Sequence, residues 1–295
     1  MQKIVPNLWF DRNAEEAIDF YTSTFPDSRI VETMRYPDEV PDFQKDFAGQ
    51  VLTIDFELFG FRFTAINAGP MFTPTPATSF FVGFDTGRDP QAREHLNQLW
   101  AALADGGQIL MPLGEYPFSK YYGWVQDRFG LSWQLILGDP EGDWRPPIIP
   151  CLLFGHTAQD RAREALEYYA SVFPESRLGQ VVDYPEPTEA AQAGAVMFGD
   201  VELAGVWMAL MDSSVPQDTT FTAAVSFAVM CDSQAEIDRY WQQLSKVPEA
   251  EQCGWCQDQF GVSWQIVPAN VTELLARPGA YEHMMGMKKL EIDKF

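Results

Sequence analysis

The sequence carries the same set of motifs twice, and this repetition restricts its fold more than any other feature. GWVQDRFGLSWQLI at residues 123–136 returns 131 positions later as GWCQDQFGVSWQIV at 254–267. IVPNLWF at 4–10 returns as IIPCLLF at 148–154, and FPDSRI at 25–30 returns as FPESRL at 173–178. Because the matching blocks keep their order, we expect a duplication of an entire domain.

The length supports this division, since 295 residues fit two domains of about 150 residues each. GDPEGDWRPP at 138–147 is rich in Pro, Gly and acidic residues, as an exposed connection would be. We therefore predict one domain at residues 1–145 and a second at 146–295. About ten extra residues, around MPLGEYPFSK, occur in the first copy only.

Hydrophobic periodicity predicts the elements within each copy. Residues 4–10 read as a strand, and 14–25 place apolar residues on one helix face, with Asn13 as the expected N-cap. Strands are expected at 28–36, 50–58 and 61–66, after which a strand at 79–85 and a helix at 90–104 restart the order. The predicted fold class is α+β, with four βαβββ modules, two per copy.

Composition excludes several classes of protein. A formal charge of −22 without a basic patch argues against nucleic-acid partners. No segment approaches the about 20 apolar residues of a membrane span, and the N-terminus lacks the pattern of a secretory signal. We expect a cytoplasmic protein whose four cysteines are reduced.

The motifs P-x-L-W-F, A-E-E-A-I-x-F-Y, F-P-x-S and D-x-F-G-x-S-W-Q resemble those of the PhnB-like branch of the vicinal oxygen chelate superfamily, which includes glyoxalases and bleomycin-resistance proteins. Members of this branch often carry the label 3-demethylubiquinone-9 3-methyltransferase. The resemblance implies curved mixed sheets that form cups for a small molecule or a metal, with helices outside. A tandem chain would then form an intramolecular pseudo-dimer, and a higher oligomer is compatible with it.

Strand alternation divides the repeated hairpin into two faces. Leu131, Trp133 and Leu135 share one face, whereas Ser132 and Gln134 share the other. By resemblance, the Trp face meets helices and the Ser-x-Gln face looks into a cup. Trp9 alternates with Leu8 on the first strand and so shares a face with Asn7, and it would contact a ligand if that face lines the cup. The candidate ligand-binding residues are Asn7, Trp9, Asn67, Phe118, Tyr122, Ser132, Gln134, Cys151, Ser263 and Gln265.

The aromatic segment at 111–124, which holds Phe118, Lys120 and Tyr122, has two interpretations. It is a lid over the first cup or an ordinary hairpin that covers a sheet edge. The sequence does not decide between them.

The resemblance also directs attention to metals and cofactors. Metal-dependent superfamily members place a Glu ligand on the last strand, where this chain has Gln134 and Gln265, and no predicted strand contains a His. Cys253 and Cys256 form a C-x-x-C motif, but they precede a hairpin rather than a helix. No glycine-rich turn for S-adenosylmethionine follows the first strand. We predict no cofactor, with a divalent metal as the open alternative, and no methyl transfer.

Two functions follow from these observations. The first is a protein that binds an apolar or aromatic metabolite in a cup without proven turnover. The alternative is an enzyme of the lyase, isomerase or dioxygenase type that a divalent metal assists. A structural pseudo-dimer with closed cups is a third possibility.

Overall fold

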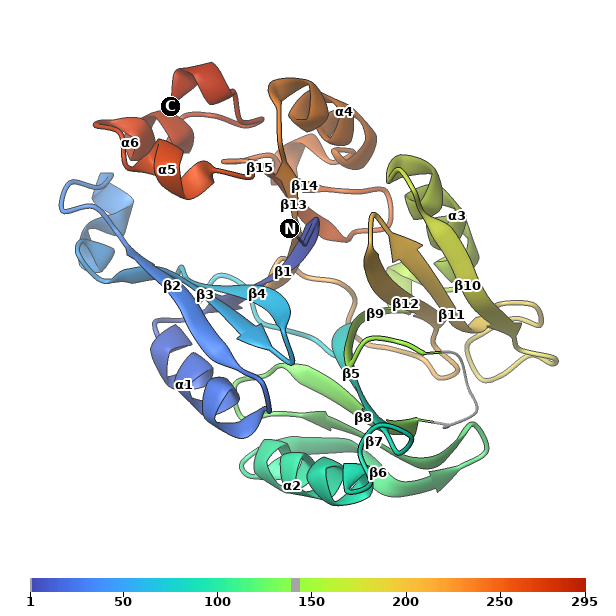
Figure 1. Cartoon of the computed structure of the whole chain (residues 1–295). Coiled ribbons are helices and arrows are strands. Elements are labelled where there is room, and N and C mark those ends of the chain that lie inside the picture. Colours follow the sequence, from blue (N-terminus) through green and yellow to red (C-terminus); the bar gives the residue numbers. More distant parts are fainter. Residues whose placement is uncertain (1, 139–143) are drawn as a thin grey trace.

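A computed structural model describes residues 2–138 and 144–295. Half of the predicted connection, residues 139–143, lies outside the described residues. The described chain forms one seven-stranded and one eight-stranded mixed sheet with helices on their outer faces (Figure 1). This architecture confirms the predicted α+β class.

Four consecutive modules build these sheets. The first contains β1 (Ile4–Phe10), α1 (Ala14–Thr24), β2 (Arg29–Arg35), the 3-10 helix η1 (Asp42–Phe47), β3 (Val51–Leu58) and β4 (Phe61–Asn67). The second contains β5 (Thr78–Asp85), α2 (Ala92–Ala104), β6 (Gln108–Tyr116), β7 (Ser119–Gln126) and β8 (Ser132–Gly138).

The second copy repeats the order of strands and α-helices up to its last module. Its first module contains β9 (Ile148–Phe154), η2 (His156–Ala158), α3 (Ala162–Val172), β10 (Arg177–Asp183), β11 (Val196–Leu203) and β12 (Val206–Asp212). The last module contains β13 (Val225–Cys231), α4 (Gln234–Leu244), η3 (Pro248–Ala250), β14 (Trp255–Gln257) and β15 (Ser263–Pro268). The prediction of a third strand after this helix was wrong, because η3 stands where the first copy has the longer β6. Then come α5 (Val271–Leu275), α6 (Ala280–Met285) and η4 (Ile292–Lys294).

Each sheet combines strands from both copies. The seven-stranded order is β14-β15-β13-β1-β4-β3-β2, and the eight-stranded order is β10-β11-β12-β9-β5-β8-β7-β6. The copies join where β1 pairs antiparallel with β13 and β5 pairs antiparallel with β9. Modules one and four therefore share one sheet, and modules two and three share the other.

Each hydrophobic core is built mainly from one copy, whereas each sheet contains strands of both copies. One core packs α1 and α2 against strands of the first copy, and includes Trp133 with Tyr21. A second core packs α3 and α4 against strands of the second copy, and includes Trp264 with Tyr169. Both tryptophans thus lie on the helix-covered face, as strand alternation predicted. The division into domains at residue 145 stays a prediction.

The aspartate of the repeated hairpin explains why the motif occurs twice. Asp127 is buried and accepts hydrogen bonds from the Tyr21 hydroxyl at 2.7 Å, the Trp133 indole at 2.7 Å, and the amides of Phe129 and Leu131. Asp258 accepts the same four types of bond in the second copy. One carboxylate thereby fixes the turn, the strand and the helix that packs on it.

The start of α1 corrects another expectation. The Asn13 side chain makes no capping bond; instead Asn67 Oδ1 accepts from the amide of Ala14 at 3.0 Å. Asp212 does the same for Ala162 in the second copy. An acceptor at the end of a neighbouring strand therefore replaces the local N-cap.

Candidate functional site

A cavity of about 1590 Å³ lies over the inner face of the seven-stranded sheet, the face opposite α1 and α4. Its walls come from both copies: β1, β3 and β4 of the first module, and β13, β14 and β15 of the last. The volume exceeds the range of about 300–1,000 Å³ that is typical of small-molecule pockets. We call this surface the hollow face.

Three aromatic rings form one wall of the cavity. Trp9 meets Phe72 edge-on at a centroid distance of 4.9 Å and Trp255 at 5.9 Å. The Trp9 indole donates to the carbonyl of Gly69 at 2.6 Å, which fixes the ring in place. This wall offers an apolar surface on which a planar molecule can pack.

Polar side chains from three adjacent strands form the floor. Gln265 on β15 donates from Nε2 to Ser226 Oγ on β13 at 3.0 Å. Ser226 lies opposite Asn7 in the antiparallel pairing of β13 with β1. Asn7 is 6% exposed and lines the cavity, yet its buried Oδ1 has no hydrogen-bond partner within the described residues. A buried acceptor without a partner is costly, which favours an occupant that supplies a donor.

One ion pair lies in the wall formed by β3 and β4. The Arg62 guanidinium contacts the Asp55 carboxylate, which also accepts from Thr64 Oγ1 at 2.6 Å. The pair is partly buried, and its charges offset each other. Further acidic side chains, Glu32, Glu249 and Glu282, line the cavity from exposed positions.

Residues of η1 and of the C-terminal helices α5 and α6 also line the cavity and contact each other. The Tyr281 hydroxyl on α6 donates to Gln44 Oε1 on η1 at 3.0 Å, and the Tyr281 ring meets Tyr36 edge-on at 6.2 Å. Burial raises the pKa of Tyr36 to about 12, so this phenol stays neutral. Apolar side chains, including Met284 and Met285, fill the rest of this contact.

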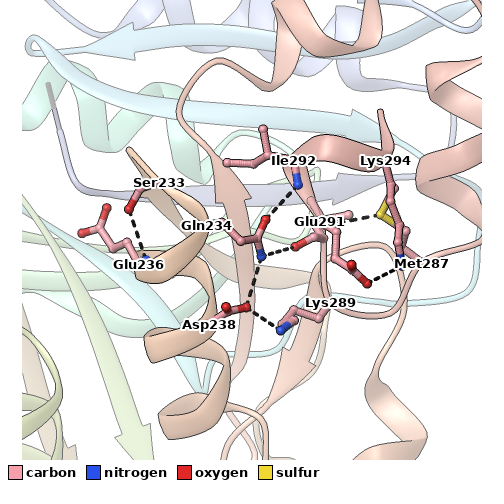
Figure 2. Close-up of polar contacts among 10 residues, drawn as sticks. Ser233, Gln234, Glu236, Asp238, Met287, Lys289, Glu291, Ile292 and Lys294 are labelled. Atoms are coloured by element: carbon pink, nitrogen blue, oxygen red, sulfur yellow. Dashed lines mark hydrogen bonds and ion pairs between the residues drawn. The ribbon is translucent and has the colours of Figure 1, made fainter.

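The C-terminal segment that lines the cavity is anchored on α4 (Figure 2). Gln234 accepts from the amide of Ile292 at 2.8 Å and donates to the carbonyl of Leu290 at 3.1 Å. Lys289 forms an ion pair with Asp238 on the same helix. These contacts hold the end of the chain beside the cavity.

The inner face of the eight-stranded sheet is occupied by its own side chains, and we call it the filled face. Ile149, Cys151, Trp207 and Ala209 are buried there, and Phe81, Phe198 and Met211 pack against them. Arg145 lies 4.0 Å from the Trp207 ring centroid and forms an ion pair with Asp200. Beside this cluster, Gln134 accepts from the Tyr122 hydroxyl at 2.6 Å.

The structure divides the candidate residues between these two faces. Asn7, Trp9, Ser263 and Gln265 line the cavity of the hollow face. Cys151, Ser132, Gln134 and Tyr122 are buried on or beside the filled face. Neither glutamine turns toward the helices, as strand alternation predicted.

Two candidates lie outside the cavity. Asn67 donates to Glu15 and to the carbonyl of Val51 in addition to capping α1, so its amide is fully used by the fold. Phe118 is 59% exposed at the turn between β6 and β7, where it stacks on Tyr116. The segment at 111–124 thus belongs to a hairpin at the sheet edge, and the lid interpretation was wrong.

Several cavity residues were missed by the sequence analysis. Phe72 lies in a loop, and Arg62 and Asp55 become neighbours only through the pairing of β3 with β4. Trp255 belongs to the repeated hairpin, where strand alternation places it and Cys256 on opposite faces. The sequence therefore contained a signal for the orientation of Trp255. The C-terminal helices have no counterpart in the first copy, and repetition gave no guide to them.

This architecture agrees with a match to a known protein family. The family model described as 3-demethylubiquinone-9 3-methyltransferase matches residues 2–136 and again 146–267. The chain belongs to this family. Residues 268–295, which contain α5 and α6, lie beyond both matches. No curated protein matches the chain at a significant level.

Several solved structures are similar to this chain. A PhnB protein from Bacillus cereus, described as a 3-demethylubiquinone-9 3-methyltransferase, is 42% identical over 46% of this chain and 100% of its own, with a TM-score of 0.41. A mutant of Zea mays glyoxalase I is 13% identical over 91% of this chain and 93% of its own, with a TM-score of 0.54. The unmodified Zea mays enzyme, 12% identical over the same shares, gives 0.51. The glyoxalase likeness shows the fold alone.

None of the helices in the described residues combines the length and the apolar composition that crossing a membrane requires.

Proposed function

We propose that the hollow face binds an apolar or aromatic small molecule and that this binding is the function of the chain. The observation that carries the proposal is the contrast between two related sheets, one filled by its own side chains and one left with a cavity of about 1590 Å³. Aromatic walls around a few polar groups are the usual composition of small-molecule sites. The pairing of β1 with β13 also supports an intramolecular pseudo-dimer, since both copies contribute walls.

The floor of the cavity does not suit the divalent metal of the metal-dependent superfamily members. Asn7 and Gln265 offer neutral amides, and Ser263 offers a hydroxyl. Hard divalent cations favour carboxylates, and transition metals favour imidazole or thiolate. Among the described residues no three His, Cys, Asp or Glu side chains gather in a metal-binding group. We derive no metal-dependent step for this chain.

Methyl transfer, which the family description names, finds no matching cofactor site in the sequence. The first strand, β1, ends in Phe10-Asp11-Arg12-Asn13, without the glycine-rich turn that binds S-adenosylmethionine-like cofactors in parallel sheets. Binding without methyl transfer therefore agrees better with these residues.

Intrinsic fluorescence tests the proposal, because Trp9 and Trp255 line the cavity. The purified chain is titrated with a panel of neutral aromatic molecules, including biphenyl and naphthalene derivatives. We expect saturable quenching with one molecule bound per chain, and calorimetry gives the same stoichiometry. If no member of a broad panel binds, the proposal is wrong.

Two variants locate the binding. Trp9→Leu gives the hollow face the residue that the filled face has as Leu153, and it should weaken every hit by about tenfold through loss of aromatic contact. Trp124→Phe changes a tryptophan bonded to Ser132 beside the filled face and should leave the affinities unchanged. Equal effects of the two variants would contradict the assignment of the cavity.

A further inference from the structure

The filled face contains a complete set of hydrogen bonds around its glutamine. Gln134 donates from Nε2 to Ser79 Oγ at 2.8 Å and accepts at Oε1 from the phenolic hydroxyl of Tyr122 at 2.6 Å. Gln134 is 3% exposed and Tyr122 is 3% exposed, so both atoms of this amide are satisfied away from water. A phenol is therefore the natural partner of this amide in one half of the molecule.

The hollow face has the same glutamine without the phenol. Gln265 donates from Nε2 to Ser226 Oγ at 3.0 Å, which orients its Oε1 as Ser79 orients that of Gln134. The sequence counterpart of Tyr122 is Cys253, and within the described residues no group donates to Gln265 Oε1. Gln265 is 8% exposed and lines the cavity. An occupant of the cavity can supply the missing donor.

Neighbouring groups show the same difference between the faces. The Trp124 indole donates to Ser132 Oγ at 2.9 Å beside the filled face. Their counterparts Trp255 and Ser263 line the cavity, and the described residues give no such bond between them. Asn7, whose buried Oδ1 has no partner within the described residues, also lines this cavity, where the filled face has Cys151. Donors and acceptors are thus both available, as a hydroxyl requires.

The charges around the cavity disfavour an anionic occupant. The Arg62 guanidinium is already paired with Asp55, and Glu32, Glu249 and Glu282 add negative charge in a chain whose net charge is −22. A carboxylate or phosphate ligand would be repelled. A neutral phenol fits both the aromatic wall at Trp9 and the free acceptor at Gln265.

We propose that the cavity selects neutral aromatic molecules that carry a phenolic hydroxyl, and that Gln265 Oε1 accepts the hydrogen bond from that hydroxyl as Gln134 does from Tyr122. This inference rests on the proposed function, because it names the ligand class of the same site. Gln265 is then the residue that determines specificity, and the filled face is an internal model of the liganded site.

Three probes of similar size test the inference: 4-phenylphenol, 4-methoxybiphenyl and biphenyl. Their dissociation constants for the full chain are measured by calorimetry and by tryptophan quenching. We expect 4-phenylphenol to bind about tenfold more tightly than the other two, which is the usual range for one neutral hydrogen bond. The methyl ether keeps the rings and the oxygen but cannot donate.

Gln265→Met removes the acceptor and keeps a side chain of similar length. We expect this variant to bind all three probes alike, with the affinity of the wild type for biphenyl. The retained biphenyl affinity shows that the variant is folded and its cavity open. Gln134→Met makes the matched change on the filled face and should leave the preference for 4-phenylphenol intact.

The outcomes separate the two proposals. If all three probes bind the wild type equally, or if Gln265→Met keeps the preference, the inference is wrong and the proposed function stands. If none of the probes binds, even at the solubility limit and with the wider panel of aromatic molecules, the proposed function fails and the inference fails with it.

Discussion

The hollow and filled faces have the same backbone pairing but opposite contents, and three pairs of corresponding residues account for the difference. Ala228 on the hollow face corresponds to Phe81 on the filled face, because each pairs with the hairpin glutamine of its sheet. By alignment of the repeats Thr53 corresponds to Phe198 and Arg62 to Trp207, and Arg62 pairs with Glu57 as Trp207 pairs with Glu202. Large aromatic side chains close one face, and smaller or polar ones leave the other open.

The duplicated framework and the cavity depend on different residues and are therefore separate properties. The framework depends on residues that both copies keep, such as the buried Asp127 and Asp258. The cavity depends on residues that differ between them. Substitutions can therefore be chosen that change one property and leave the other.

The largest expected effect concerns the shared framework. Asp127→Ala and Asp258→Ala each leave a buried tyrosine hydroxyl, a buried indole and two amides without their acceptor. We expect each variant to lose about 3–5 kcal/mol of the free energy of unfolding, measured by urea denaturation. The exposed Asp19→Ala is the control and should change stability by less than about 0.5 kcal/mol. A loss below about 1 kcal/mol at either site would show that the turn does not depend on its carboxylate.

The next effect concerns the cavity itself. Ala228→Phe places the filled-face side chain on the hollow face, where Ala228 lines the cavity. A phenyl ring in that position takes the volume of a bound ligand, so the affinity for 4-phenylphenol should fall by about 100-fold or more. Calorimetry measures the affinity, and urea denaturation checks that the variant folds.

An exposed alanine supplies the control for this variant. Ala101→Phe adds the same ring on the outer side of α2 and should bind the probe like the wild type. Unchanged binding by Ala228→Phe, in a protein shown to be folded, would place the binding site elsewhere.

The framework was largely predictable from the sequence, and particular residues show why. Trp133 and Gln134 fall on opposite faces because a strand alternates, and this rule needs no tertiary information. The first three strands after α1 and the helix at 14–25 followed from apolar periodicity with small errors at their ends. Because the motifs occur in both copies, each of these patterns is present twice in the sequence.

The contents of the two faces were not predictable in the same way. Phe81 and Ala228 both lie in apolar strands, and nothing local shows that one closes a cavity and the other leaves it open. That result depends on β5 pairing with β9 and β1 with β13, which are contacts between copies. Asn67 was misassigned for a related reason, because its partner Ala14 lies 53 residues away at the start of a helix.

The reciprocal change on the filled face should have a smaller effect. Phe81→Ala removes a ring that packs against Cys151 and Trp207 and contacts Phe198 at 6.1 Å between centroids. Because Phe81 is only partly buried, we expect a loss of about 2 kcal/mol in the free energy of unfolding. A newly opened space should then bind biphenyl weakly at a second site, while the first affinity stays unchanged. Calorimetry with one site in the wild type and two in the variant would confirm that this residue closes the face.

The smallest expected effect uses cysteines as reporters of the two faces. Burial raises the pKa of the Cys151 thiol on the filled face to about 12, so at pH 8 only about one molecule in 10⁴ carries the reactive thiolate. Cys253 lines the cavity and is only partly buried; burial raises the pKa of this thiol as well. Since both pKa values lie above the ordinary value, alkylation should be slow near neutral pH and should accelerate as the pH rises. We expect iodoacetamide to modify Cys253 at least about tenfold faster than Cys151, and 4-phenylphenol to slow only the reaction of Cys253, as peptide mass spectrometry measures. Equal rates at the two thiols would mean that the filled face opens as readily as the hollow one, and the contrast between them would not describe the protein in solution.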